Sequence, residues 1–218
     1  MKYQAIIWDL DGTLLDTLQD LTASVNAALQ AHGCPARTLE EVRSFVGNGV
    51  RNLMLRAVPE GREDVDFEAL FRDFRAHYAA HYNDATAPYP GVMEVLHTLH
   101  EQGVALAVVS NKLDSAVKAL CTRHFGSLIP VAIGEQEGVP RKPAPDSVYR
   151  AMELLGTADA LYIGDSEVDI ATAKNAGLPC ICVSWGFRPE EALRAAGAER
   201  IAPDADTLMA LLDRRSAP

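Results

Sequence analysis

The sequence lacks the features that mark membrane-spanning and nucleic-acid-binding proteins. No uninterrupted apolar run approaches the roughly 20 residues that a membrane-spanning helix requires. Lysine and arginine number 20 against 30 aspartates and glutamates, so the formal net charge is -10. Nucleic-acid binding depends on basic side chains that neutralise phosphates, and this balance argues against it. We therefore expect a cytoplasmic protein that binds neither nucleic acid nor a membrane.

Cysteine is also scarce, and its spacing does not suggest a metal or redox motif. The four cysteines, Cys34, Cys121, Cys180 and Cys182, form no Cys-x-x-Cys pair, and we expect buried reduced thiols rather than disulfides. The chain is 48% hydrophobic and 23% charged over 218 residues, which is typical of a globular protein. This composition excludes disorder as a description of the whole chain.

Strand-like alternation is absent between Asp16 and Asp84. Apolar residues in this block recur at spacings of three and four, which is typical of amphipathic helices. Thr38 and Glu41 have the spacing of a capping box, in which each side chain satisfies a backbone amide of the other. The block is therefore predicted to be a small helical bundle, with helices near 18–29, after Thr38, over 50–57 and over 67–78.

From Pro88 onward, apolar runs of strand length alternate with amphipathic helical stretches. Unbroken apolar strands between helices indicate a parallel sheet covered on both faces, and the first run, 5–8, needs the same sheet. We therefore predict an α/β fold: a doubly wound, Rossmann-like core made of residues 1–15 and 86–218, with an all-helical cap domain, 16–85, inserted after the first strand. The later runs are 104–109, 128–133, 160–163 and 179–183, and the helical stretches are 92–102, 114–124, 145–155 and 168–176.

Charged and polar residues follow several of the predicted strands, at the edge where doubly wound sheets bind ligands. Carboxylates from two strand ends would crowd one edge, and each like-charged pair at about 4 Å costs roughly 4 kcal/mol at an effective dielectric near 20. Such a cluster needs a cation, and oxygen ligands favour Mg²⁺, with Lys142 as a positive partner. The segments concerned are 9–13, 110–112, 141–145 and 164–169.

The order of these segments resembles the phosphatase branch of the haloacid dehalogenase superfamily. The resemblance rests on DLDGTLLDT at 9–17, VVSNK at 108–112, RKPAPD at 141–146 and GDSEVD at 164–169, and it covers nearly the whole chain. One Asp-x-Asp alone would be weak, because it occurs by chance in many proteins. Four motifs in this order, each at a predicted strand end or helix start, make chance implausible.

The resemblance implies a role for each matching residue. Asp9 is expected to attack phosphorus and form an aspartyl-phosphate, and Asp11 to act as the general acid and base. Lys142 is expected to neutralise charge, with Asp169 supporting Lys142 or the water shell of the metal. The phosphate would be bound by Thr13, Ser110 and Asn111, and Mg²⁺ by Asp9, the backbone carbonyl of Asp11, and Asp165.

Two other branches of this superfamily are argued against. Its dehalogenases lack the second aspartate, which is present here as Asp11, and its phosphonatases need a lysine in the cap. There is no lysine between Lys2 and Lys112. Three activities remain as alternatives for this chain: phosphatase, pyrophosphatase and phosphomutase.

The inserted block looks like the helical cap of the branch that contains phosphoglycolate phosphatases, since FVGNGVRNLMLRA at 45–57 is similar to their cap loop. This resemblance makes 2-phosphoglycolate the leading substrate, although similar caps also serve sugar phosphates. Asn48 and Arg51 could hold the substrate carboxylate near the start of a helix. The alternative is a plain interhelical turn with a solvated Arg51.

Two hypotheses lie outside the enzymes: a phospho-aspartate signalling domain, and a scaffold on an inactive phosphatase fold. The intact set Asp9, Asp11, Lys142 and Asp165 argues against both. We therefore expect a Mg²⁺-dependent phosphomonoester hydrolase that acts on a small phosphorylated metabolite, as a monomer or a homodimer.

Overall fold

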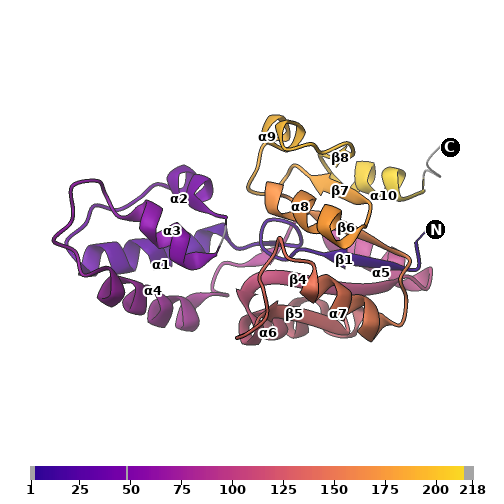
Figure 1. Ribbon diagram of the computed structural model, residues 1–218, viewed down its shortest axis with the longest axis horizontal. Coiled ribbons are helices and arrows are strands. Elements are labelled where there is room, and N and C mark those ends of the chain that lie inside the picture. Colours follow the sequence, from indigo (N-terminus) through magenta and orange to yellow (C-terminus); the bar gives the residue numbers. More distant parts are fainter. Residues whose placement is uncertain (1–2, 48, 214–218) are drawn as a thin grey trace. The chain divides into compact units, whose positions relative to one another are not determined.

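The computed structural model describes residues 3–47 and 49–213, and the chain divides into two units (Figure 1). The core unit contains residues 1–15 and 88–218, and the inserted unit contains residues 16–87. The chain passes between the units at two short strands that pair with each other, β2 (Leu15–Asp16) and β3 (Ala87–Pro88).

The core unit is built on a six-stranded sheet with the order β5-β4-β1-β6-β7-β8, in which neighbouring strands run parallel. Trp8, the last residue of β1, lies in register with Val108 of β4 and Ile163 of β6. The first strand is therefore central, and the residues that follow it emerge beside those that follow β4 and β6. The strands are β1 (Ala5–Trp8), β4 (Ala105–Leu113), β5 (Val131–Glu135), β6 (Ala160–Gly164), β7 (Cys180–Val183) and β8 (Ile201–Ala202).

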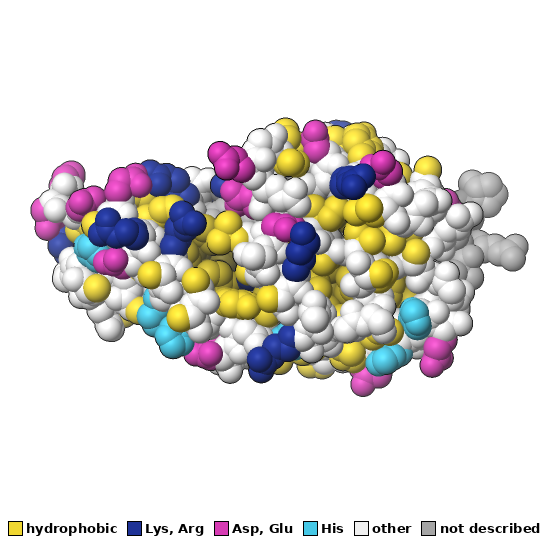
Figure 2. All heavy atoms as spheres, turned by 90° about the horizontal axis from the view of Figure 1, so that it is seen from below, with side chains coloured by type: hydrophobic (Ala, Val, Ile, Leu, Met, Phe, Trp, Pro, Cys, Tyr) yellow, Lys and Arg dark blue, Asp and Glu magenta, His cyan; other side chains and the backbone are white. Residues whose placement is uncertain are grey.

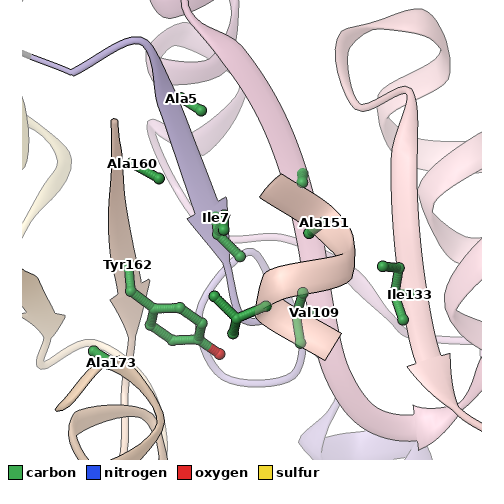
Figure 3. Packing of buried hydrophobic residues seen from close by; sticks show 10 residues of the cluster. Ala5, Ile7, Val109, Ile133, Ala151, Ala160, Tyr162 and Ala173 are labelled. Atoms are coloured by element: carbon green, nitrogen blue, oxygen red, sulfur yellow. The ribbon is translucent and has the colours of Figure 1, made fainter. Parts of the chain in front are cut away.

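Helices cover both faces of this sheet, which confirms the predicted doubly wound fold. On one face, α7 and α8 pack over a cluster that includes Ile7, Val109 and Tyr162 (Figure 3). Residues that alternate with these, such as Ile6 and Trp8, are buried as well, as expected for strands covered on both faces. The core helices are α5 (Val92–Glu101), α6 (Asp114–Phe125), α7 (Asp146–Leu155), α8 (Glu167–Ala176), α9 (Glu190–Ala195) and α10 (Ala205–Asp213).

The sequence-based prediction was wrong at the ends of two strands and did not include the last elements of the core. The run at 104–109 was expected to end before Ser110, but β4 continues to Leu113. The run at 128–133 was expected to be one strand, but residues 126–128 form a 3-10 turn, and β5 begins only at Val131. Pro130 lies between them, and a proline has no N–H to donate to a strand ladder. The two-residue strand β8 and the helices α9 and α10 were not predicted.

In its described residues the inserted unit has four helices, α1 (Leu18–Ala31), α2 (Leu39–Phe45), α3 (Val50–Ala57) and α4 (Phe67–His81). Apolar side chains at helical spacing, such as Val25 and Leu29 on α1 and Leu70 and Phe74 on α4, are fully buried where α1 packs on α4. The capping box is confirmed, because the Thr38 side chain accepts from the Glu41 amide while Glu41 accepts from the Thr38 amide.

A buried carboxylate joins the two ends of the inserted unit. Asp20, in the first turn of α1, accepts hydrogen bonds from the amides of Ala85 and Thr86 and from the Thr86 hydroxyl, at 2.7–3.1 Å. These bonds satisfy the charge of Asp20 without a basic partner. They fix the segment that leaves this unit beside the segment that enters it.

On the face shown in Figure 2, basic side chains are interspersed with acidic and hydrophobic ones. Within the described residues, no helix combines the length and the apolar character needed to span a membrane.

Candidate active site

Four segments of the core unit bring their polar residues together at the carboxyl ends of β1, β4 and β6. Asp9 and Asp11 follow β1, Ser110 lies near the end of β4, Asp165 follows β6, and Lys142 comes from the loop before α7. Because β1 lies between β4 and β6, the parallel order of the strands alone makes these ends neighbours.

The centre of the site is the ammonium group of Lys142, whose side chain is 4% exposed. Its nitrogen lies 2.8 Å from Oδ1 of Asp9 and 2.8 Å from Oδ1 of Asp169. It also donates to the hydroxyl of Tyr162 at 3.1 Å, and that hydroxyl lies 3.2 Å from Oδ1 of Asp169. The other oxygen of Asp169 accepts from the amide and hydroxyl of Ser166, so both of its oxygens are bound within the protein.

Asp165 is oriented by two donors from different segments. The Thr13 hydroxyl donates to its Oδ1 at 3.1 Å, and the backbone amide of Phe187 donates to its Oδ2 at 2.7 Å. Thr13 was expected to bind phosphate, and in the structure its buried side chain orients this carboxylate.

Two glycines allow the backbone to approach Asp165 closely. A Cβ on Gly12, whose φ is +86°, would lie 2.4 Å from Oδ2 of Asp165. A Cβ on Gly186 would lie 2.2 Å from the carbonyl oxygen of Gly12 and 2.5 Å from the same carboxylate oxygen. Neither position has room for a side chain, so the turn after β1 and the loop after β7 enclose Asp165.

The carboxylates of Asp9, Asp165 and Asp169 have oxygens within 4.8 Å of one another and are all buried. Burial and the nearby charge of Asp169 raise the pKa of Asp9 to about 7, although Lys142 lowers it. Burial and the charge of Asp169 also raise the pKa of Asp165 well above its usual range. Burial lowers the pKa of Lys142, but the charges of Asp169 and Asp9 outweigh it and hold this pKa above the usual value for a lysine. When ionised, three buried carboxylates with one ammonium carry excess negative charge, and their oxygen donors fit a hard divalent cation.

The predicted metal ligands and this trio differ in one member. The sequence predicted Asp9, Asp11 and Asp165, with Asp11 contributing its backbone carbonyl. In the structure the Asp11 side chain is not part of the trio and pairs with Lys112, with 2.9 Å between Nζ and Oδ1. Asp169 is the third carboxylate of the trio, in contact with Lys142, and this leaves the predicted role of the Asp11 backbone carbonyl as a prediction.

The residues after Val109 are held by local hydrogen bonds. Ser110 Oγ accepts from the Lys112 amide at 3.2 Å. The Asn111 side chain accepts from the Lys142 amide at 2.9 Å and donates to the Lys142 carbonyl at 3.0 Å, so it fixes the backbone that carries this lysine.

Sequence reasoning missed three contributors: Lys112, Tyr162 and the loop at 185–187. Lys112 was visible within the VVSNK motif but received no role. The loop follows a predicted strand, so the rule that ligands bind at strand ends could have found it. Its Trp185 donates from the indole nitrogen to the Thr13 carbonyl at 3.0 Å. The contact of Tyr162 with Lys142 carried no signal in the sequence, because the ring belongs to an apolar strand.

The two cap residues singled out from the sequence belong to the inserted unit. Asn48 lies outside the described residues. Arg51 donates to both carboxylate oxygens of Glu68, and its guanidinium lies over the rings of Phe67 and Phe71, 5.0 and 5.3 Å from their centroids. Its side chain is 47% exposed, so the guanidinium is neither fully solvated nor buried.

The fold and the site together are those of a hydrolase with an α/β core and a buried cluster of carboxylates and a lysine at a sheet edge. The family model for haloacid dehalogenase-like hydrolases matches residues 6–183, and the chain belongs to this family. The resemblance drawn from the four motifs is thereby confirmed.

Similar proteins include a phosphoglycolate phosphatase of Rhodobacter capsulatus, 36% identical over 188 residues, which covers 84% of this chain and 85% of that one. A phosphoglycolate phosphatase of Pseudomonas putida is 33% identical over 215 residues, covering 94% of this chain and 78% of that one. Among solved structures, a candidate phosphoglycolate phosphatase from Lactobacillus delbrueckii subsp. bulgaricus superposes with a TM-score of 0.91 at 36% identity. That match covers 97% of this chain and 99% of the other.

Proposed function

We propose that this protein is a Mg²⁺-dependent phosphomonoester hydrolase that converts 2-phosphoglycolate to glycolate and phosphate. The observation that carries the proposal is the contact of Lys142 with Asp9, 2.8 Å apart inside a buried acidic cluster. The named activity of the relatives at 33–36% identity supports the choice of substrate. We expect the enzyme to act in the cytoplasm as a monomer or a homodimer.

The reaction proceeds in two displacements. In the first, an oxygen of Asp9 bonds to phosphorus while the bond from phosphorus to the alcohol oxygen breaks, and Asp11 gives its proton to the departing oxygen. In the second, a water oxygen bonds to phosphorus, the bond to Asp9 breaks, and Asp11 takes back a proton from that water. The products are the alcohol and inorganic phosphate, and both aspartates return to their starting state.

The remaining residues orient the nucleophile and balance charge. Lys142 holds Asp9 in place and offsets the negative charge of the phosphoryl group, and Asp169, Tyr162 and Asn111 hold Lys142. When bound, Mg²⁺ would be held by Asp9, Asp165 and the Asp11 carbonyl, and would neutralise the phosphoryl oxygens. Ser110 is proposed to bind a phosphoryl oxygen through its hydroxyl.

The covalent step is tested by mass spectrometry of two variants mixed with p-nitrophenyl phosphate and Mg²⁺. Asp11→Asn keeps the nucleophile and loses the proton transfers, so a phosphorylated protein should accumulate, because this leaving group needs little acid. Asp9→Asn has no phosphoryl acceptor and should stay unmodified. A phosphorylated Asp9→Asn protein would refute the assignment of the nucleophile.

The substrate is tested by measuring kcat/KM over a panel of phosphorylated metabolites. We expect the highest value for 2-phosphoglycolate. A higher value for a sugar phosphate or pyrophosphate would favour that alternative, and transfer of the phosphoryl group to a second hydroxyl would indicate a phosphomutase. A phosphorylated protein that releases no phosphate would indicate a signalling domain.

A further inference from the structure

A second lysine lies at the active site, and the mechanism above does not use it. The Lys112 side chain is 5% exposed, and its ammonium nitrogen lies 2.9 Å from Oδ1 of Asp11, which is 24% exposed. The pair is separate from the contacts of Lys142 with Asp9 and Asp169. Each of the two aspartates after β1 therefore has its own lysine.

An irregularity in β4 places Lys112 at this point. Val109 pairs with Ile133 and Leu113 with Glu135, so four steps along β4 match two steps along β5. The extra residues lie within 110–112, where the Lys112 amide donates to Ser110 Oγ. Such bulges redirect side chains and are common beside active sites. Here Ser110 and Lys112 are both buried, and Lys112 reaches the turn after β1.

Stability alone is a weak reason for this lysine. Burying an ammonium group is costly, and a buried ion pair often stabilises a fold no better than apolar residues of similar size. The neighbouring β4 residues Val108 and Val109 are fully buried and apolar, so the strand does not otherwise call for a charge. The partner, in contrast, is the residue to which the proposed mechanism assigns both proton transfers.

We propose that Lys112 is a positioning residue for Asp11. Its ammonium donates to Oδ1 and fixes the orientation of the carboxyl group, so that Oδ2 carries the proton given to the leaving oxygen and recovered from water. A general acid must lie within hydrogen-bond reach of the atom it protonates, and small misplacements are costly in rate. The inference rests on the proposed function, because it concerns the proton transfers of that reaction.

The test compares the kinetics of Lys112→Met and the wild type with two substrates that differ in their leaving group. With an alkyl phosphate, which needs an acid for the first step, kcat should fall roughly 10- to 100-fold. With p-nitrophenyl phosphate, rapid-mixing measurements should show a near-normal burst of p-nitrophenol followed by slow turnover, because only the second step still needs Asp11. Equal losses in the burst rate and the steady rate would overturn the proposal in favour of a structural role, and so would unchanged kinetics.

A double variant tests whether Lys112 acts through Asp11. Adding Lys112→Met to Asp11→Asn should lower the steady rate no further, since residues that act as a unit are not additive. A further loss of tenfold or more would contradict the proposal. If Lys112→Met does not fold, Lys112→Gln allows the same comparison.

The matched control is Lys118→Met, which removes another lysine–aspartate pair of the core unit, that of the exposed Lys118 with Asp114 on α6. This variant should have wild-type kinetics with both substrates. A wild-type protein that hydrolyses no phosphate monoester would refute the proposed function itself. If the wild type is active and Lys112→Met has the same kinetics, this inference is refuted and the proposed function stands.

Discussion

Lys142 and Asp169 form an ion pair in which 2.8 Å separates Nζ from Oδ1, and neither side chain is more than 4% exposed. Removing one partner of such a pair leaves a buried charge uncompensated, which costs far more than the net value of the pair. Lys142 therefore compensates the buried charge of Asp169, and it does the same for Asp9, its second partner.

Lys142→Met should abolish measurable phosphatase activity and lower the free energy of unfolding by about 3–5 kcal/mol, because Asp9 and Asp169 lose their counter-charge. Chemical denaturation and phosphate release measure the two effects. Adding Asp169→Asn to this variant removes one of the repelling charges, so it should recover part of the stability and none of the activity. Lys174→Met, an exposed lysine on α8, is the control and should change neither.

Stability without a divalent cation should fall as the pH rises. The folded-state pKa of Asp9 is about 7 against an ordinary value of 3.8, so the folded protein binds this proton more tightly than the unfolded chain does. This contribution to stability is complete below about pH 4 and is lost as the pH rises through about 7. In EDTA, the free energy of unfolding should therefore decrease between about pH 4 and about pH 7, by on the order of a few kcal/mol, and Tm should fall with it.

Added Mg²⁺ should raise Tm more at the upper end of this range than at the lower, because the cation replaces the proton. Asp9→Asn should reduce the slope of the EDTA profile, since it removes one of the two carboxylates whose pKa is raised and leaves Asp165. A wild-type Tm in EDTA that rises with pH over this range would contradict the prediction. Phosphate release should require Mg²⁺, and Ca²⁺ should support it poorly, because Ca²⁺ takes more ligands at longer distances.

Gly12→Ala should weaken cation binding, because its Cβ would lie 2.4 Å from Oδ2 of Asp165 and so displace that carboxylate. We expect Mg²⁺ affinity and activity to fall roughly 10- to 100-fold. Gly156→Ala is matched to it, with a similar φ of +72° and no atom within 4 Å of the added Cβ. That control should lose about 1 kcal/mol of stability and keep its activity. Similar Mg²⁺ titrations for both variants would show that backbone strain alone explains the effect.

Arg51→Ala tests whether this arginine binds the substrate carboxylate. If it does, kcat/KM for 2-phosphoglycolate should fall roughly 10- to 100-fold while turnover of p-nitrophenyl phosphate, which has no carboxylate, stays unchanged. Glu68→Gln removes the charge paired with Arg51 and keeps the arginine, so it should preserve both activities. Equal losses on both substrates would assign Arg51 to the structure of the inserted unit, and no loss on either would favour a plain turn.

Much of the site was predictable because parallel strands bring distant segments to one edge. Asp9 and Asp165 could be placed near each other from the order of apolar runs alone, and the lysine of RKPAPD followed from the family motif. The pairings within the site were not predictable. Thr13 orients Asp165 and Asn111 binds the backbone of Lys142, although both were expected to contact phosphate. Each of these contacts depends on a side-chain direction, which hydrophobic periodicity does not specify.

The amino-acid sequence by itself determined the alternation of strands and helices, the helical insertion after the first strand, and the family, because these depend on local periodicity and on the order of motifs. Only the tertiary structure decided which lysine pairs with which aspartate. Lys112 binds Asp11 because β4 carries extra residues relative to β5, and Lys142 lies between Asp9 and Asp169 because the loop that carries it is fixed by Asn111. Such pairings are set by register, burial and shifts of a few ångströms, which arise only when the sheet is assembled.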